Sequence, residues 1–427
     1  MMLLQFAVEN YLSMRDRVEI SMVASALKDD ETNLISLPTL PGRSILPCAL
    51  IYGANASGKS NLISALGRMR RIVLYSHTRG QPDGGVPLDP FALDAASTRK
   101  PTLFELDFVQ DGVRYQYGFA ADKSEVKKEW LFSYPNGRRQ NLFRRNGQKF
   151  TFGRHLKGRN VTISSLTRGN SLFISAAAQN DHDQLTKIYR YFRDITISYS
   201  LGLNDPSNNS FFERRKVDQR AIDFLKEIGT GVVSFKQKSE KAPDQVKEFY
   251  QGITELISKI SKDSDFSPSE MDEIVKIELG HSAKGGDTVF LELEHESAGT
   301  RRLLYQLHVI FDALDRGGVI VVDELDASIH TQACEAILAL FVSPELNKKG
   351  AQIIAAIHDT NILSTPFIRR DEIWFAEKDE EGATAIFPLS DISVRKGDNI
   401  ERGYLQGRFG AVPYDGSALS LVRRYKD

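Results

Sequence analysis

A short glycine-containing segment near the start of the chain carries residue types that bind phosphate groups. Residues 53–60 are GANASGKS, which matches the pattern G-x-x-x-x-G-K-[ST] and follows an apolar run. In such loops the backbone N–H groups wrap the phosphates, the lysine reaches the β and γ phosphates, and the next hydroxyl ligates Mg²⁺. The sequence therefore predicts a nucleotide site built from Gly53, Asn55, Ala56, Ser57, Gly58, Lys59, Ser60 and Asn61, with Ser60 as a metal ligand.

Two carboxylates follow a second apolar run. Residues 319–322 are VIVV, and Asp323 and Glu324 come directly after them. A carboxylate at the carboxyl end of a central parallel strand can face a phosphate-binding loop across the sheet. We therefore expect Asp323 to hold Mg²⁺, mostly through water, and Glu324 to polarise the attacking water. Without the glycine loop, an acidic pair after a strand would not by itself predict a metal site or a catalytic base.

Two further segments add candidate site residues. Ser297 and Gly299 lie at the start of a predicted helix, in the segment ESAGT. Taken alone, Ser297 is an ordinary helix N-cap, which contributes about 1 kcal/mol. Together with the glycine loop, the small residues predict a second anion-binding helix end. His358 ends the apolar run IIAAI, and this position favours a role in sensing the γ-phosphate or orienting water over a structural role.

The elements that must position these residues alternate between strand and helix. Apolar runs predict strands at 44–53, 319–324 and 351–359, and helical spacing predicts helices at 60–76 and 330–342. Residues 102–122 alternate at period two around Asp111-Gly112, which predicts a β-hairpin. Residues 171–194 are expected to form a strand followed by a helix. The fold class is therefore α/β.

Composition divides the chain and limits the functions to consider. Residues 205–272 are polar with amphipathic helical spacing, which predicts a helical insertion between lobes at 1–204 and 273–427. The net charge is -1, from 55 basic and 56 acidic residues, so no global field draws the chain to nucleic acid or membrane. The two cysteines, Cys48 and Cys334, suit a reducing cytoplasm, and no signal peptide or run of about 18 apolar residues is present.

The motifs in this order resemble the head of ABC-type ATPases. The segment SAGT and the N-terminal VENYLSMRD are similar to those of the SMC, RecF and OLD-like class. The C-terminal RKGDNIERGYLQGRFGAVP resembles a narrower group, the ATPase subunits of bacterial anti-phage defence modules such as the PARIS ATPase and the RloB-associated ATPases. The resemblance covers most of the chain and is weakest over 205–272. It implies an ABC-type P-loop ATPase head with an N-terminal β lobe and a helical insertion.

The resemblance also implies how the site is completed. Two heads would dimerise face to face, as a dimer or a multiple of dimers, with each ATP between Lys59 of one chain and Ser297 and Gly299 of the other. Asp326 matches the D-loop by position. Gln179 is the candidate for the Q-loop glutamine, and Gln116 is a weaker one.

Two departures from the family shape the functional hypothesis. The insertion is too short for the long coiled coil of SMC proteins, and the residues after His358 lack the Glu and D-x-D pattern of the TOPRIM nuclease domain in OLD proteins. We therefore expect a cytoplasmic ATPase that senses a trigger, such as a nucleic acid or phage protein, and controls a separately encoded effector, for example a TOPRIM-type nuclease, in anti-phage defence.

The alternative is a RecF-like DNA-binding ATPase in DNA repair. Four basic clusters keep this alternative open, although each can also be a solvated face, which the net charge favours. They are Arg68-Arg70-Arg71, Arg138-Arg139, Arg144-Arg145 and Arg214-Arg215-Lys216. The segment SAGT and the N-terminal segment VENYLSMRD disfavour a transporter ATPase.

Overall fold

The structure is a computed structural model that describes residues 1–412, except for 28, 30, 199–215, 242–243, 245–246, 249–251, 253–272 and 396. It divides into two compact units. The first comprises Met1–Ser200, Ala313–Asp326 and Cys334–Asp427, and the second comprises Leu201–Asp312 and Ala327–Ala333. The α/β class predicted from the sequence is confirmed. The boundaries at 204 and 272 stay a prediction, and the amphipathic stretch at 244–262 lies mostly outside the described residues.

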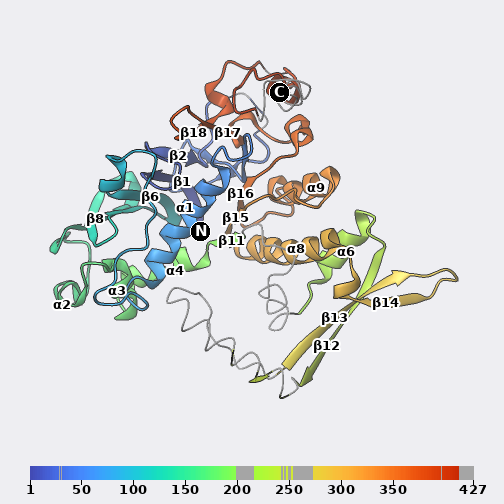
Figure 1. The fold of residues 1–427 in the computed structure, drawn as a ribbon, viewed down its shortest axis with the longest axis horizontal. Coiled ribbons are helices and arrows are strands. Elements are labelled where there is room, and N and C mark those ends of the chain that lie inside the picture. Colours follow the sequence, from blue (N-terminus) through green and yellow to red (C-terminus); the bar gives the residue numbers. More distant parts are fainter. Residues whose placement is uncertain are drawn as a thin grey trace, which may run out of the picture. The chain divides into compact units, whose positions relative to one another are not determined.

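The first unit contains a six-stranded, mostly parallel sheet (Figure 1). Its neighbouring strands pair in parallel up to β17, which pairs with β18 in antiparallel fashion. The strand order is β11 (Thr196–Ser198), β15 (Val319–Val322), β16 (Gln352–Ala356), β5 (Cys48–Tyr52), β17 (Ile373–Lys378) and β18 (Thr384–Pro388). The three central strands are buried along their whole length, which explains why they are continuous apolar runs.

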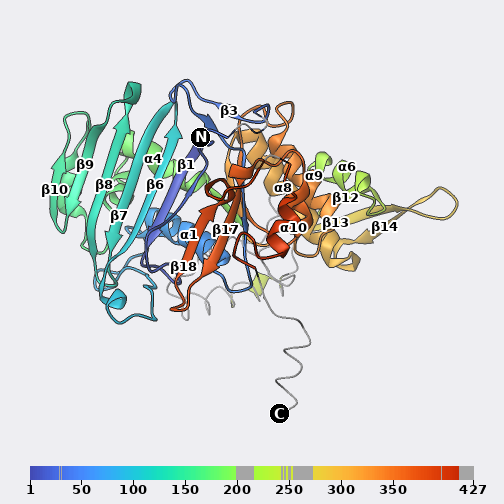
Figure 2. The same cartoon turned by 90° about the horizontal axis from the view of Figure 1, so that it is seen from above.

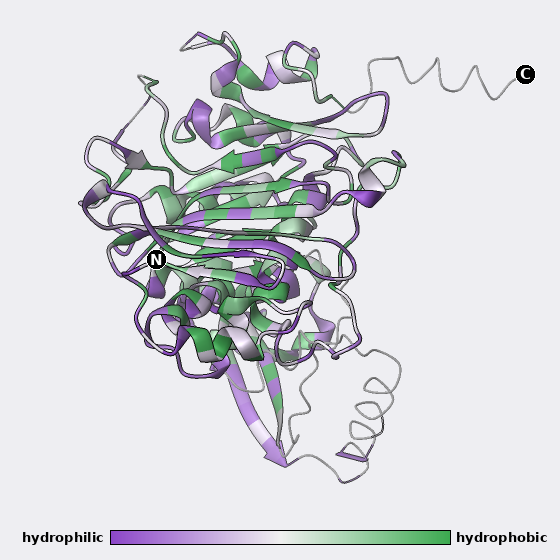
Figure 3. Cartoon of the chain, turned by 90° about the vertical axis from the view of Figure 1, so that its left-hand side faces the viewer, coloured by the Kyte–Doolittle hydropathy of each residue, from purple (hydrophilic) through white to green (hydrophobic). Residues whose placement is uncertain are grey.

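The same unit carries a seven-stranded antiparallel sheet, drawn at the left of Figure 2. Hydrophobic and hydrophilic residues alternate along its strands, as the banding in Figure 3 shows. The predicted hairpin at 102–122 is confirmed as the β6–β7 pair. The strand order is β10 (Lys149–Phe152), β9 (Gln140–Asn146), β8 (Val126–Tyr134), β7 (Val113–Ala121), β6 (Thr102–Gln110), β1 (Met2–Glu9) and β2 (Val18–Ser21).

Helix α1 (Lys59–Tyr75) follows the glycine loop and contacts both β1 and the helices α3 and α4. Its buried residues have the helical spacing predicted from the sequence, and they include Leu62, Leu66, Met69, Ile72 and Val73. The other elements of this unit are short: β3 (Ile35–Ser36), β4 (Ser44–Ile45), α2 (Asn160–Leu166), α3 (Phe173–Gln179), α4 (Asp183–Asp194), α10 (Ile400–Leu405), and the 3-10 turns η1 (Ser97–Arg99), η2 (Pro135–Gly137), η4 (Thr360–Ser364), η5 (Arg370–Glu372) and η6 (Leu389–Asp391). Helix α9 (Thr331–Val342) connects β15 to β16.

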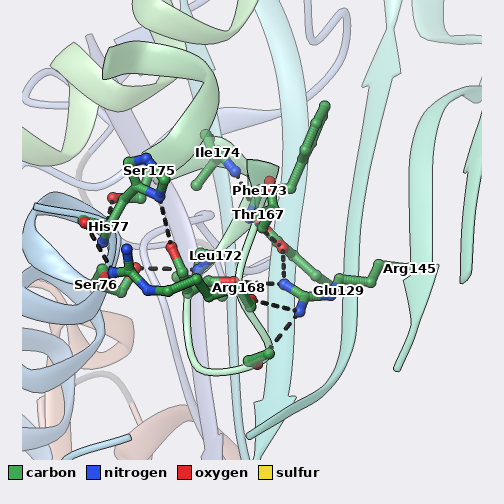
Figure 4. Close-up of polar contacts among 12 residues, drawn as sticks. Ser76, His77, Glu129, Arg145, Thr167, Arg168, Leu172, Phe173, Ile174 and Ser175 are labelled. Atoms are coloured by element: carbon green, nitrogen blue, oxygen red, sulfur yellow. Dashed lines mark hydrogen bonds and ion pairs between the residues drawn. The ribbon is translucent and has the colours of Figure 1, made fainter. Parts of the chain in front are cut away.

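The strand expected near residue 171 is wrong, because residues 173–179 form helix α3. The cause is a long-range contact. The buried Glu129 carboxylate on β8 accepts hydrogen bonds from the N–H groups of Phe173, at 2.7 Å, and Ile174, at 3.1 Å (Figure 4). A carboxylate at this place stabilises a helix start, since the first N–H groups of a helix have no partner within it.

A buried network ties both α3 and the far end of α1 to the antiparallel sheet (Figure 4). The Arg145 guanidinium lies 3.6 Å from the Glu129 carboxylate and also donates to the Ser171 carbonyl. The neighbouring Arg168 donates to the carbonyls of Ser76, at 3.2 Å, and His77, at 2.9 Å, which follow the last turn of α1. A cation there is favourable because helix carbonyls point out of that end. The helix that begins at Lys59 is therefore held in place from its far end.

The second unit is built on a three-stranded antiparallel sheet, in the order β12 (Val232–Lys241), β13 (Glu273–Ser282) and β14 (Thr288–Glu292). Helices α6 (Gln219–Glu227) and the first part of α8 (Ala298–Arg316) belong to it, with the turn η3 (Leu293–His295). Strand β12 was not predicted, since 205–272 was expected to be helical. It pairs with β13 along its length, and this pairing outweighs its polar composition.

None of the helices in the described part of the chain has the length and apolar content that a bilayer crossing requires. Both cysteine thiols are free and buried, and burial raises the pKa of each.

Candidate nucleotide site

The site lies where three neighbouring parallel strands end at one edge of the six-stranded sheet. Ile51 on β5 pairs with Ala356 on β16, and Ala355 pairs with Val322 on β15. The carboxyl ends of parallel strands meet at the same edge. The glycine loop, the Asp323–Glu324 pair and His358 each follow one of these strands, so the structure brings these three segments together.

The glycine loop approaches its surroundings too closely for larger residues. A Cβ atom at Gly58, whose φ is +111°, would collide with the Thr384 hydroxyl, and one at Gly53 would collide with the Ala376 carbonyl. Lys59 is buried, and its Nζ donates to the carbonyls of Gly53, at 2.7 Å, and Ala54, at 3.1 Å. The lysine ammonium is therefore held inside the curve of the loop, where the motif predicts phosphate binding.

The predicted metal ligands are in contact. The Ser60 hydroxyl donates to Asp323 Oδ1 at 3.2 Å. Burial raises the pKa of the Asp323 carboxyl, and the Ser60 hydrogen bond and the charges of Lys59 and His358 oppose that rise. Burial also lowers the pKa of Lys59, against the charges of Asp323, Asp326 and Glu324. An ammonium and several carboxylates thus share a partly desolvated edge, where electrostatic interactions are stronger than in water.

The chain after β15 is held in a constrained conformation. Glu324 has φ +53°, a left-handed value that is uncommon for a residue other than glycine. Hydrogen bonds fix the backbone on both sides of it: the Asp323 N–H donates to the Ser198 carbonyl, and the Leu325 N–H donates to the Ala356 carbonyl. Non-glycine residues in such conformations cluster at functional sites. The direction of the Glu324 side chain is therefore set by its backbone.

Asp326 ties the acidic segment to the segment that carries His358. Its Oδ2 atom accepts hydrogen bonds from the N–H groups of His358, at 2.9 Å, and Asp359, at 2.6 Å. The His358 residue itself is exposed at the sheet edge. The structure thus places Asp326 at the base of the turn that presents His358.

The residues present fit a nucleotide and a magnesium ion. The buried Ser57 hydroxyl in the loop has no hydrogen-bond partner, which is unusual for a buried polar atom. Asn55, Ala56 and Ser60 are exposed on the loop. Among the described residues, no group of three or more His, Cys, Asp or Glu side chains could hold a metal ion. Mg²⁺ in phosphate-binding sites takes one or two carboxylates together with substrate phosphates, which the Ser60–Asp323 pair suits.

Ser297 and Gly299 belong to the second unit and stand at the start of α8. Ser297 is an N-cap: its hydroxyl accepts a hydrogen bond from the Thr300 N–H at 3.1 Å. Gly299 lies against the backbone of Ser328, where a Cβ would be 2.5 Å from the Ser328 carbonyl oxygen. Close packing therefore explains the glycine. A nucleotide contact by this helix start stays a proposal.

The structure does not bring Gln179 to the glycine loop. It is the last residue of α3, and its side chain interacts with Tyr189, whose hydroxyl donates to the Leu74 carbonyl at 3.0 Å. Leu74 lies in the final turn of α1, about 20 Å along that helix from Lys59 at a rise of about 1.5 Å per residue. The weaker candidate, Gln116, accepts a hydrogen bond from the Tyr134 hydroxyl on the antiparallel sheet.

The hydroxyls of Ser13 and Thr384 support the glycine loop through hydrogen bonds, and neither residue was predicted as a site residue. The Thr384 hydroxyl lies 2.8 Å from the Ser57 carbonyl and 2.8 Å from the Ser13 hydroxyl. Asn61 Nδ2 donates to the same Ser13 oxygen at 2.7 Å. Ser13 is the serine of the N-terminal segment VENYLSMRD, so the resemblance of that segment could have indicated a role for Ser13. Thr384 stands in an ordinary hairpin, and nothing in its sequence context pointed to the loop.

The basic clusters are mostly engaged within the fold. Arg68 contacts the Tyr11 hydroxyl and the Asp89 carboxylate, and Arg70 donates to the Phe192 carbonyl. Arg145 is buried. Arg139 and Arg144, on the antiparallel sheet, are exposed. Their guanidinium groups lie 3.8 Å and 5.1 Å from the centre of the Phe132 ring. The cluster at 214–216 lies outside the described residues except for Lys216.

Three solved structures are similar to the chain over most of its length at low sequence identity. The SMC head domain from Thermotoga maritima is 14% identical, with 91% of this chain and 99% of that chain covered and a TM-score of 0.39. The SmcHead bound to the C-winged helix domain of ScpA is 12% identical, with coverages of 90% and 97% and a TM-score of 0.39. The Smc head domain bound to the C-terminal domain of ScpA derived from Pyrococcus furiosus is 13% identical, with coverages of 90% and 96% and a TM-score of 0.39.

No curated protein matches the chain. The protein family described as "AAA domain, putative AbiEii toxin, Type IV TA system" matches residues 48–364. This range begins at β5, contains the glycine loop and both acidic and histidine segments, and ends with η4. The chain therefore belongs to this family of AAA-domain, P-loop ATPase proteins.

Proposed function

We propose that the chain binds ATP with Mg²⁺ and hydrolyses it slowly to ADP and phosphate. The observation that carries the proposal is the contact between Ser60 and Asp323 at the sheet edge, directly beside the buried Lys59. Two oxygen ligands for a hard cation and an ammonium for phosphate thus meet at one loop, contributed by segments that are far apart in the sequence.

Each residue has a role in the proposed reaction. Lys59 and the loop N–H groups bind the β and γ phosphates, and Ser60 and Asp323 hold Mg²⁺. The metal ion, when bound, neutralises charge on the phosphate oxygens. Glu324 accepts a hydrogen bond from the attacking water and orients it, and His358 senses the γ-phosphate.

Replacing Glu324 by Gln tests this assignment. The amide keeps the size of the side chain but is a far weaker base, so ATP binding should persist while hydrolysis falls at least about a hundredfold. Glu380→Gln, in the exposed β17–β18 turn, makes the same chemical change and is the matched control. Measurement of phosphate release and of nucleotide affinity separates binding from chemistry. Normal turnover in Glu324→Gln would refute the role of Glu324.

We further propose that a second copy of the chain completes the site, as a head-to-head dimer or a multiple of dimers. The helix start at Ser297 and Gly299 would then contact the phosphates bound at Lys59 of the partner copy. Support comes from the position of Ser297 and Gly299 at the start of α8, since the first N–H groups of a helix bind anions favourably. In the Glu324→Gln variant, ATP should trap the closed dimer, which light scattering with and without ATP would detect.

At the level of the cell, we propose that nucleotide-driven assembly controls a separately encoded effector in anti-phage defence, a nuclease of the TOPRIM type being the candidate. The trigger would be a nucleic acid or a phage protein. The description of the matching family names a putative AbiEii toxin of a type IV TA system. Co-purification with the product of the neighbouring gene, with and without ATP, tests this proposal, and a neighbour that encodes a permease would count against it.

The alternative is a RecF-like DNA-binding ATPase, and one observation favours it. The exposed Arg139 and Arg144 both lie against the ring of Phe132 on the antiparallel sheet. Binding of duplex DNA that weakens steeply with salt, and weakens further in the Arg139→Gln variant, would support this alternative.

A further inference from the structure

The C-terminal stretch at 399–412 forms a compact structure, here called the C-terminal motif. Its helix α10 begins at the Asn399 side chain, which accepts from the Arg402 N–H at 2.7 Å. It ends with two hydrogen bonds, from the Gly407 N–H to the Tyr404 carbonyl and from the Arg408 N–H to the Gly403 carbonyl. These two bonds form a Schellman motif. The ring of Phe409 then packs back against Gly403, where a Cβ would be 2.6 Å away from it.

The motif packs against the strand that leads into the glycine loop. The Tyr404 ring stacks on Phe375 at 5.4 Å and meets the ring of Tyr52 edge-on at 6.1 Å. Phe409 stacks on the same Phe375 at 5.9 Å. Tyr404 and Phe409 are each only 3% exposed. Tyr52 is the residue directly before Gly53, so the motif forms part of the packing on which the glycine loop rests.

The C-terminal motif also makes hydrogen bonds to η4, the turn that follows His358. Glu401 on α10 accepts hydrogen bonds from both ends of η4, from the Thr360 hydroxyl at 3.3 Å and the Ser364 hydroxyl at 2.9 Å. The Tyr52 hydroxyl donates to the Asp359 carbonyl at 3.3 Å. On the other side, Asp326 holds the N–H groups of His358 and Asp359. The turn is thus fixed from the acidic segment, from β5 and from the C-terminal motif.

We infer that Glu401 is a positioning residue for His358, with the stacked rings of Tyr404 and Phe409 as its platform. Glu401 acts by fixing η4, whose first residue lies two positions after His358. The inference rests on the proposed ATP hydrolysis, in which His358 acts at the γ-phosphate. The C-terminal motif, for which the sequence indicated only a resemblance, would thereby have a structural role at the site.

The test compares Glu401→Ala with Glu401→Gln and with Arg402→Gln, a charge-removing control at the exposed neighbouring position of the same helix. Steady-state phosphate release gives kcat, and binding of a fluorescent ATP analogue gives affinity. Hydrogen exchange of a peptide covering 357–364 reports on the turn itself. We expect kcat to fall about tenfold in Glu401→Ala with affinity unchanged within about twofold, because a displaced His358 would weaken an interaction that is made only in the transition state.

The amides of 357–364 should exchange faster in Glu401→Ala than in the control. Glu401→Gln keeps one acceptor oxygen and should recover part of the kcat. The inference is overturned if Glu401→Ala and Arg402→Gln have the same kcat and the same exchange, or if Glu401→Ala loses nucleotide affinity and melting temperature together with kcat. If the full-length protein shows no hydrolysis although the exchange difference is present, the proposed reaction fails while the positioning of the turn stands.

Discussion

The buried Glu372 carboxyl makes the stability of the first unit depend on pH. Glu372 is fully buried, and burial raises its pKa from 4.5 to about 8. The nearest cation cannot compensate, because the Arg369 guanidinium is engaged with both oxygens of Asp371, at 2.9 Å each. The carboxyl accepts a hydrogen bond from the Arg369 N–H, at 2.8 Å, and burial outweighs the effect of this bond and of the Cys48 backbone on the pKa. Glu372 is therefore mostly protonated in the folded protein at neutral pH.

The sign of the effect follows from this raised pKa. Below pH 4.5 the carboxyl is protonated in both states, and between 4.5 and 8 the unfolded chain releases a proton that the folded chain retains. The free energy of unfolding therefore falls as pH rises through this window. At about 1.4 kcal/mol per pH unit, we expect a loss of about 4 kcal/mol between pH 5 and pH 8 that the Glu372→Gln variant does not show.

Urea unfolding followed by tryptophan fluorescence at several pH values measures this difference, because Trp374 lies on β17 two residues after Glu372. The exposed Glu380→Gln is the control for the chemical change. The reasoning is refuted if the unfolding free energies of the wild type and Glu372→Gln run parallel from pH 5 to pH 8.

Three further predictions concern the site and its support. Gly58→Ala should abolish the binding of a fluorescent ATP analogue. The reason is that the alanine Cβ would collide with the Thr384 hydroxyl and that φ at this position is +111°. Retained affinity for the analogue would contradict the loop geometry. Chains carrying Lys59→Ala and Ser297→Arg, each inactive alone, should regain part of the ATP hydrolysis when mixed, and mixed dimers without activity would argue against shared sites. Glu129→Ala should lower the free energy of unfolding by about 3–5 kcal/mol in urea titration, because it leaves the buried Arg145 charge without a carboxylate beside it. A loss below about 1 kcal/mol would contradict this prediction.

Local patterns were sufficient for the core of the site. The glycine loop, Asp323 and His358 each follow an apolar run, and parallel strands leave their following residues at one edge of a sheet. The sequence could thus predict which segments meet without knowing any distance. This logic does not apply to Gln179, because the expectation for it comes from its residue type and the resemblance, and Gln179 ends helix α3 and follows no strand.

The parts that could not be predicted depend on contacts between distant residues. The sequence before residue 180 predicts a strand, but the Glu129 carboxylate, 44 positions before Phe173, holds the first N–H groups of helix α3. Strand β12 has a polar composition and forms because β13 is available for pairing. Thr384 lies 371 positions after Ser13, and neither residue alone indicates that both support the glycine loop. Periodicity within a short window contains no information of this kind.

The support of the glycine loop has a consequence for how the protein matures on the ribosome. The loop at 53–60 is synthesised well before Thr384, which braces the Ser57 carbonyl and lies 327 positions after Ser57. A nascent chain that has reached Glu324 carries every residue of the loop and the proposed metal ligands, yet lacks strands β16, β17 and β18 and one of the two bracing hydroxyls. The proposed nucleotide site should therefore become competent only after Thr384 has been synthesised.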